Sequence, residues 1–190
     1  MGRFNAFEKE IDFSFWREIC HSHGKTLGYR RGEYFVHEGE VMRSVGWIVT
    51  GGFKHSLTDS VGCAKSVGFV FEGSILANYI SVMKGEPMPI DIIALENSEV
   101  LVVPASMIRD RLLYDPTLSI RFAQALFAQA YGIILDGYRL TPEQRYHNLA
   151  ERFPRIFDLV SLGEIASYLN ISRRQLHRFR ESGAESSAKQ

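Results

Sequence analysis

Residues 161–180 read SLGEIASYLNISRRQLHRFR, a stretch with the features of two short helices joined by a tight turn. Ser161 with Glu164 forms the S-x-x-E pattern of a capping box, and Ser172 with Gln175 forms its S-x-x-Q equivalent, so each helix carries its own start signal. Asn170 lies in the turn, where it tolerates a left-handed backbone better than most residues. The apolar side chains that we expect to pack the two helices together are Leu162, Ile165, Ala166, Leu169, Ile171, Leu176 and Phe179.

The outward face of the second helix is basic. From Ser172 to Arg180 the chain holds four arginines, one histidine and no acid. A solvated basic face on an ordinary helical hairpin is one interpretation. The order of features favours a helix-turn-helix instead, and Arg and Gln side chains match the edges of guanine and adenine. The sequence therefore predicts a DNA-binding face made of Ser172, Arg173, Arg174, Gln175, His177, Arg178 and Arg180.

The composition is that of a globular protein. With 190 residues, 45% hydrophobic and 23% charged, the chain can bury a core and form one large or two small domains. A formal net charge of zero argues against a nucleic-acid partner. The acids lie mainly in the first two thirds of the chain, however, so the local field around the last arginines is the relevant quantity.

Cysteine usage and the amino terminus predict a cytoplasmic protein. Cys20 and Cys63 are far apart in the sequence, and the first residues lack the apolar core of a signal peptide. Cys20, His21 and His23 resemble metal ligands, but no second cluster matches them. We interpret them as the end of a short amphipathic helix and expect no metal.

Between residues 28 and 103 the pattern changes to short strands separated by turns rich in Gly, Asn and Asp. Many short strands without long helices between them predict an antiparallel barrel or jelly roll, which encloses a pocket. The predicted strands cover residues 34–36, 46–49, 52–57, 66–70, 90–95 and 100–103.

Two helices are expected after Pro104, over residues 105–113 and 116–139. The longer one carries two apolar stripes. We expect the first, at Leu118, Phe122, Ala125, Gln129 and Ile133, to lie on the barrel, and the second to meet an identical helix. A transmembrane span is the alternative, but the uncharged segment is short and contains two glutamines. The predicted dimer interface is Ile120, Ala123, Phe127, Ala130 and Ile134.

The order of barrel, long helix and helix-turn-helix resembles the Crp/Fnr family, the cyclic-AMP receptor protein type of bacterial transcription regulator. In the barrel the resemblance rests on Val-His-Glu-Gly-Glu at 36–40 and Gly-Trp-Ile-Val-Thr-Gly-Gly at 46–52. In the carboxyl-terminal part it rests on Ile-Ser-Arg-Arg-Gln-Leu-His-Arg at 171–178, similar to the family's recognition helix. It covers nearly the whole chain from about Tyr29 onward.

The resemblance implies an α+β protein with three functional parts. These are an amino-terminal double-stranded β-helix (jelly-roll, cyclic-nucleotide-binding-like) domain, a long dimerisation helix and a carboxyl-terminal helix-turn-helix domain. It also implies a homodimer that binds an inverted repeat in double-stranded DNA, with RNA polymerase as a further candidate partner and no membrane. The expected divisions are 1–115 for the barrel with its flanking helices, 116–139 for the dimer helix, 140–181 for the DNA-binding domain and 182–190 for a disordered tail.

The chain departs from the family at the cyclic-phosphate site. The alignment places Ala77-Asn78 where cyclic-AMP binders have Gly-Glu, and Met88-Pro89 where they have Arg-Ser. Met and Pro offer a phosphate almost no donors, so we expect no binding of cyclic AMP. An unknown small effector and the absence of any effector both stay open. The candidate residues for such an effector pocket are Asn78, Tyr79, Ser81 and Met88.

A second departure is the lack of the small β wing that family members commonly carry beyond the recognition helix. An alternative function is therefore a ligand- or protein-binding sensor that has lost DNA binding. A cupin-type enzyme is a rival from another class, but it needs several converging histidines, and this barrel offers only His37 and His55. We predict no catalysis.

Overall fold

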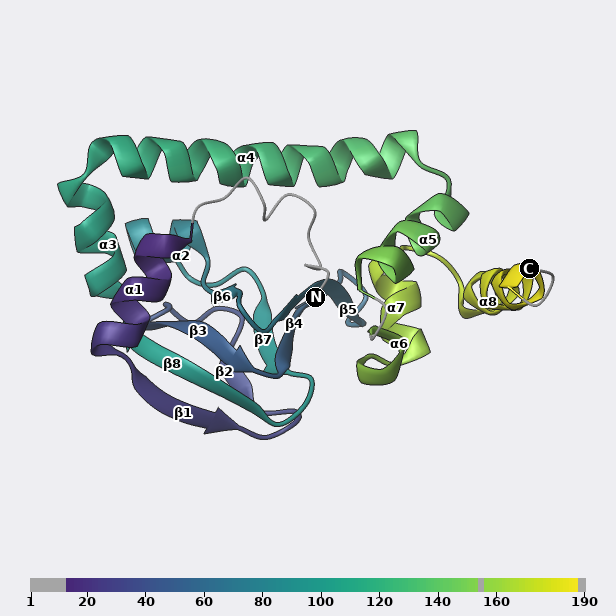
Figure 1. The fold of residues 1–190 in the computed structure, drawn as a ribbon, viewed down its shortest axis with the longest axis horizontal. Coiled ribbons are helices and arrows are strands. Elements are labelled where there is room, and N and C mark those ends of the chain that lie inside the picture. The colour runs from purple at the N-terminus through teal and green to yellow at the C-terminus, as the bar shows by residue number, and fades with distance from the viewer. Residues whose placement is uncertain (1–12, 154–155, 188–190) are drawn as a thin grey trace.

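The computed structural model of the chain describes residues 13–153 and 156–187. Figure 1 shows a β-barrel with short helices around it, a group of helices at the opposite end, and one long helix that runs along both. The two parts are joined through this long helix and through a direct contact beside β5.

The barrel consists of two four-stranded antiparallel sheets with strand orders β1-β8-β3-β6 and β2-β7-β4-β5. The antiparallel barrel predicted from the sequence is thus confirmed. Two strands were missed, the exposed and Gly-containing β1 and the two-residue β6, because neither has an apolar alternation to detect. The strands are β1 (Lys25–Tyr29), β2 (Tyr34–Val36), β3 (Ser44–Thr50), β4 (Gly52–Thr58), β5 (Ala64–Phe71), β6 (Ile75–Leu76), β7 (Asp91–Ala94) and β8 (Ser98–Pro104).

Three helices lie against the barrel: α1 (Ser14–His23), α2 (Tyr79–Lys84) and α3 (Ala105–Tyr114). The end of α1 carries the histidines that resembled metal ligands. Among residues 13–153 and 156–187, no group of three His, Cys, Asp or Glu side chains could hold a metal ion.

Helix α4 (Pro116–Arg139) has the bounds predicted from the sequence. Its Phe122 is buried in an aromatic cluster, with ring centroids 5.6 Å from Phe15, 6.1 Å from Trp16 and 6.0 Å from Tyr79. Burying several aromatic rings together contributes more than their area alone. This cluster fixes the first half of α4 to the barrel.

The two stripes of α4 have different surroundings. Leu118 and Ala125 pack against the barrel core with Phe122, as expected for the first stripe, whereas Ile133 is exposed. In the second stripe Phe127 is 70% exposed and stacks on Tyr131 with ring centroids 5.8 Å apart. By length and composition alone, α4 is also apolar enough to cross a membrane.

Within residues 140–153 and 156–187 the structure describes four helices: α5 (Pro142–Arg152), α6 (Ile156–Leu159), α7 (Leu162–Tyr168) and α8 (Arg173–Ser187). Of these helices, only α7 and α8 were predicted from the sequence. Helix α5 was missed although Thr141 and Gln144 form a capping box ahead of it, with a proline in its first turn.

The disordered tail expected from residue 182 onward is corrected as far as Ser187. Helix α8 continues to that residue, and residues 188–190 lie outside the described part of the chain. A helix that has already formed adds residues without a new nucleation step, so α8 extends through Gly183 and the neighbouring serines despite their lower helix propensity.

Candidate nucleic-acid interface and effector pocket

Helix α7 starts with the predicted capping box. The Glu164 amide donates to Ser161 Oγ at 3.3 Å, and Glu164 Oε2 accepts from the Ser161 amide at 3.2 Å. Asn170 has φ 53° in the turn, which confirms the left-handed backbone predicted there. Between the two helices Ile165, Ala166, Leu169, Leu176 and Phe179 are buried, as predicted.

Helix α8 starts with a second mutual cap. The Gln175 amide donates to Ser172 Oγ at 3.2 Å, and Gln175 Oε1 accepts from the Ser172 amide at 2.9 Å and from Ser172 Oγ at 3.0 Å. Ser172 and Gln175 were predicted to contact DNA. In this structure their side chains hold the start of α8, and the side-chain nitrogen of Gln175 takes no part in that cap.

The basic side chains of α8 are exposed, as a face that binds a polyanion requires. Arg173, Arg174, His177, Arg178 and Arg180 are all exposed. The groove along this face has a volume of about 430 Å³ and is lined by Ser172, Arg174, Gln175, His177, Arg178 and Glu181.

Arg173 and Arg178 both have neighbours within the protein. A Cβ atom added to Gly163 would lie 2.5 Å from an Nη atom of Arg173, so the guanidinium lies over the first turn of α7. The guanidinium carbon of Arg178 lies 5.6 Å from the centre of the Phe179 ring, a cation–π distance. Arg174, whose side chain lines the groove, is therefore a better candidate for reading bases than Arg173.

Arg145 is a positioning residue that no sequence motif indicated. Its Nη1 donates to the Gly137 and Leu140 carbonyls at 3.2 and 3.0 Å, and its Nη2 donates to the Leu169 carbonyl at 3.1 Å. One guanidinium thus joins the end of α4 to the turn before α8. Guanidinium groups suit this role because their donors are rigidly spaced.

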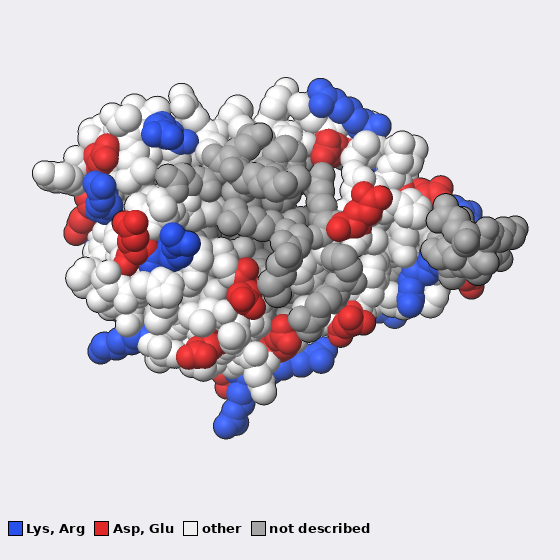
Figure 2. Space-filling model, viewed as in Figure 1, with Lys and Arg blue, Asp and Glu red and all other residues white. Residues whose placement is uncertain are grey.

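Charge is mixed over the face of the molecule seen in Figure 2. Blue and red side chains alternate there, including around the end that carries α8. This pattern agrees with the formal net charge of zero and means that attraction to a polyanion would depend on the arginines of α8 themselves.

His55 on β4 has a buried polar atom. The Nε2 atom of His55 is buried and has no hydrogen-bond partner among the described residues, although the residue as a whole is half-buried. Desolvation by burial lowers the pKa of His55 to about 4, so its imidazole is neutral at pH 7.

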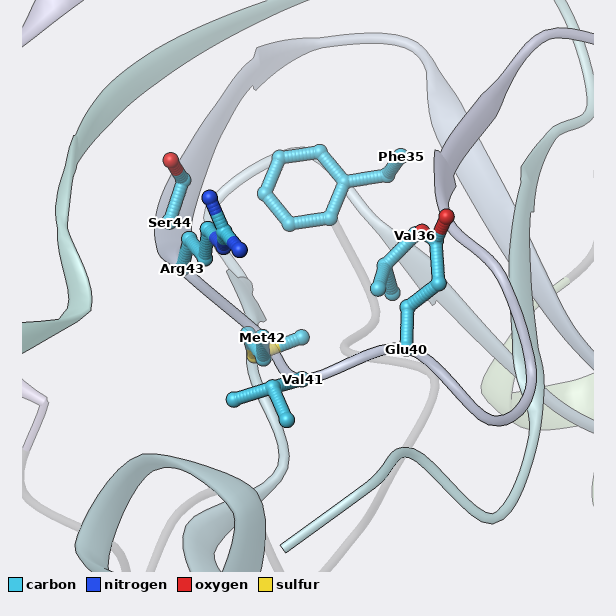
Figure 3. A pocket seen from close by; sticks show the side chains of 7 residues that line it. All are labelled: Phe35, Val36, Glu40, Val41, Met42, Arg43 and Ser44. Atoms are coloured by element: carbon cyan, nitrogen blue, oxygen red, sulfur yellow. The ribbon is translucent and has the colours of Figure 1, made fainter. Parts of the chain in front are cut away.

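A cavity of about 470 Å³ opens where β2 leads into β3 (Figure 3). Figure 3 shows the Arg43 guanidinium beside the ring of Phe35, with the Glu40 carboxylate on the other side. The cavity is lined by Phe35, Val36, Glu40, Val41, Met42, Arg43 and Ser44.

Comparison with known proteins identifies the barrel. Residues 26–114 match the sequence model of the cyclic nucleotide-binding domain family. This part of the chain has the fold of a cyclic nucleotide-binding domain. A comparison with curated proteins finds no match.

Solved structures resemble the chain beyond residues 26–114. FixK2 from Bradyrhizobium japonicum has a TM-score of 0.73 at 17% identity, and the match covers 86% of each chain. The c-di-GMP responsive global regulator CLP from Xanthomonas campestris has a TM-score of 0.65 at 11% identity, with 93% of each chain covered. The catabolite activator protein of Thermus thermophilus has a TM-score of 0.54 at 15% identity, with 90% of this chain and 83% of that chain covered. At these identities the likeness shows a shared fold.

Inside the barrel domain, the residues predicted to form an effector pocket have other partners. Asn78 caps α2 by accepting from the Ser81 amide at 3.0 Å, and Ser81 Oγ accepts from the Met42 amide at 3.2 Å. The Tyr79 hydroxyl lies 3.5 Å from that of Ser119 on α4, and Met88 is buried in the core. Ser81 and Tyr79 thus link α2 to the segment just before β3 and to α4, and none of the four predicted residues lines the cavity of Figure 3.

Proposed function

We propose that the chain is a homodimeric, non-catalytic DNA-binding regulator of the Crp/Fnr type, which reads a duplex with α8 and acts in the cytoplasm. The observation that carries this proposal is the exposed set of arginines on α8, a helix whose start is capped and whose inner face is buried on α7. A rigid helix with exposed guanidinium groups is suited to the major groove.

The fold supports the proposal. CLP and the catabolite activator protein carry the names of regulators, and each resembles this chain over at least 83% of its length. In this proposal α7 and α8 form a helix-turn-helix, in which α7 supports α8 and the turn with Asn170 sets the angle between them.

The dimer would form through the second stripe of α4. Ile120 and Ile134 are exposed on that stripe with Phe127, and one copy of the chain leaves them in water. An identical helix would cover them, whereas a bilayer would conflict with the barrel that is packed on Leu118 and Phe122. Two α8 helices related by a two-fold axis would then read an inverted repeat.

The test begins with selection of bound sequences from a random duplex pool, followed by anisotropy titrations. The Arg174→Ala variant should lose about 1 to 3 kcal/mol of affinity for the selected duplex and lose much less for a random one. Arg180→Ala, which removes the same charge, should weaken both duplexes alike because it contacts phosphate. Equal losses for the two variants on both duplexes would contradict base reading by Arg174.

The salt dependence separates this proposal from the alternative of a sensor without DNA binding. Phosphate contacts release counterions, so affinity should fall steeply between low and moderate salt. If the dimer binds neither the selected pool nor random duplex at low salt, the DNA-binding proposal is wrong and the sensor alternative takes its place.

A further inference from the structure

The helices α5–α8 share one hydrophobic core with the outer face of the barrel. Phe69 and Phe71 of β5, together with Leu95, are buried in the same cluster as Ile165 of α7 and Leu176 of α8. The Phe71 ring stacks on that of Phe153 with centroids 4.0 Å apart. A core made from both parts means that neither buries its apolar surface alone.

Strand register explains why these barrel residues face outward. Lys54 lies opposite Phe69, and Gly52 lies opposite Phe71 in the pairing of β4 with β5. Residues directly opposite in an antiparallel pair project from the same face of the sheet. A Cβ atom on Gly52 would lie 2.5 Å from the Phe71 ring, so the glycine leaves the room that this ring occupies.

Polar contacts cross the same boundary. Lys54 Nζ lies 2.5 Å from Glu164 Oε1, and both side chains are about three-quarters buried, with 23% and 25% of their surface exposed. The amide of Ser66 on β5 donates to Ser167 Oγ of α7 at 3.1 Å. Strand β5 is at the edge of its sheet, so α7 covers an edge that would otherwise be open.

Glu164 connects this contact to the start of α7. The same carboxylate that pairs with Lys54 through Oε1 accepts from the Ser161 amide through Oε2. A shift of α7 would therefore break the Lys54–Glu164 ion pair, the capping box or both. Because α8 is packed on α7 through Leu176, the same contacts also hold α8 in place.

We infer that the outer face of β4 and β5 is a structural part of the DNA-binding unit, and that Lys54 is a positioning residue for α8. Within residues 140–153 and 156–187 all regular structure is helical, so the sheet layer of this unit comes from the barrel. The role in DNA binding rests on the proposed function of α8, whereas the shared core does not.

The experiment measures amide hydrogen exchange of α7 and α8 in the full chain. Lys54→Met keeps the aliphatic stem and removes the charge, and it should speed exchange in these helices by roughly three- to tenfold. Lys65→Met is the matched control, because Lys65 lies on β5 and pairs at 3.7 Å with Asp59 of the neighbouring loop. Equal exchange in α7 and α8 for the two variants would overturn the inference.

A double-mutant cycle identifies the partner. Glu164→Gln keeps an oxygen acceptor for the capping box and removes the charge that attracts Lys54. Its effect on exchange should nearly vanish in the Lys54→Met background, since the two residues act as one pair. Additive effects of the two changes would contradict the assignment of Lys54 to Glu164.

Anisotropy titration of the same variants links the contact to DNA. Lys54→Met should reduce affinity for selected and random duplex by a similar factor, roughly three- to tenfold, because it misplaces α8 and touches no base. Unchanged affinity would show that Lys54 does not position α8 for DNA. If the parent protein binds no duplex while exchange responds as expected, the proposed function fails and the shared core stands.

Discussion

Gln175 Oε1 accepts hydrogen bonds from both the amide and the hydroxyl of Ser172, at 2.9 and 3.0 Å. The residue at the start of α8 and the residue three positions later thus hold each other in place. The sequence predicted this cap as well as a place for Gln175 on the DNA-binding face. The cap is present and fixes the start of the helix that carries the arginines, and a contact of Gln175 with DNA stays a prediction.

Replacing Gln175 with Ala should lower the free energy of unfolding by about 0.5 to 2 kcal/mol, because the Ser172 amide loses its acceptor. Gln175→Glu keeps the acceptor and should have a smaller effect. Urea unfolding followed by circular dichroism measures both. A loss of affinity confined to one base pair of the selected duplex, with unchanged stability, would assign Gln175 to base reading instead.

Replacing Arg145 with Met should destabilise the carboxyl-terminal helices. Three carbonyl groups, those of Gly137, Leu140 and Leu169, lose a charged donor, which we expect to cost about 1 to 3 kcal/mol. Arg139→Met, at the exposed end of α4, is the control. Thermal unfolding should show a lower midpoint for Arg145→Met and an unchanged midpoint for Arg139→Met. Equal midpoints for the two variants would show that the hydrogen bonds of Arg145 do not stabilise these helices.

Changing Phe127 to Asp should convert the protein to a monomer. The side chain is 70% exposed in one copy, and a partner helix would bury two like charges across the two-fold axis. Tyr114→Asp is a suitable control, since Tyr114 is 86% exposed at the end of α3, outside the stripe. Sedimentation velocity decides the question: a Phe127→Asp dimer as tight as the parent would place the interface elsewhere.

Cyclic AMP should not bind in the manner of the family's nucleotide-responsive members. Asn78 is occupied as the cap of α2, Met88 is buried in the core, and neither Met88 nor Pro89 has a side-chain donor for a phosphate. Calorimetry at millimolar nucleotide should show no heat of binding. A micromolar dissociation constant would contradict this prediction.

His55 should make the fold less stable in mild acid. Its pKa is lowered to about 4 by burial, so between pH 6.5 and 4 the unfolded chain takes up a proton that the folded chain does not. Stability should therefore fall by on the order of 1 to 2 kcal/mol between pH 7 and 5.

His55→Gln cannot take up this proton and should lose most of that pH dependence in urea unfolding. The pKa of Glu164 is also lowered: burial would raise it, but the hydrogen bonds and charge of Lys54 and the hydrogen bonds of Ser161 outweigh burial. The stability that the Glu164 carboxylate contributes is present above its unfolded pKa and is lost at lower pH. This loss lies below the range from pH 7 to 5 over which the His55 effect is measured. An unchanged pH dependence in His55→Gln would assign the acid sensitivity to other groups.

Local features of this protein could be predicted from the sequence because their causes lie within a few residues. The capping boxes at Ser161 and Ser172, the left-handed Asn170 and the bounds of α4 depend on side chains three or four positions apart. Most strands followed from their β-branched and aromatic runs. The exposed β1 escaped detection because its partner, β8, supplies the pairing that its own residues do not signal.

The contacts that decide where the candidate site sits belong to the tertiary structure alone. Lys54 and Glu164 are separated by 110 residues, and Ser66 and Ser167 by 101, so no pattern in the chain announces either pair. Phe69 was predicted only as part of the barrel strand at residues 66–70, and Phe71 lay outside every predicted strand, yet both complete the core beneath α7 and α8. The reason is physical: a strand has two faces, its alternation shows which residues share a face, and only packing determines what covers that face.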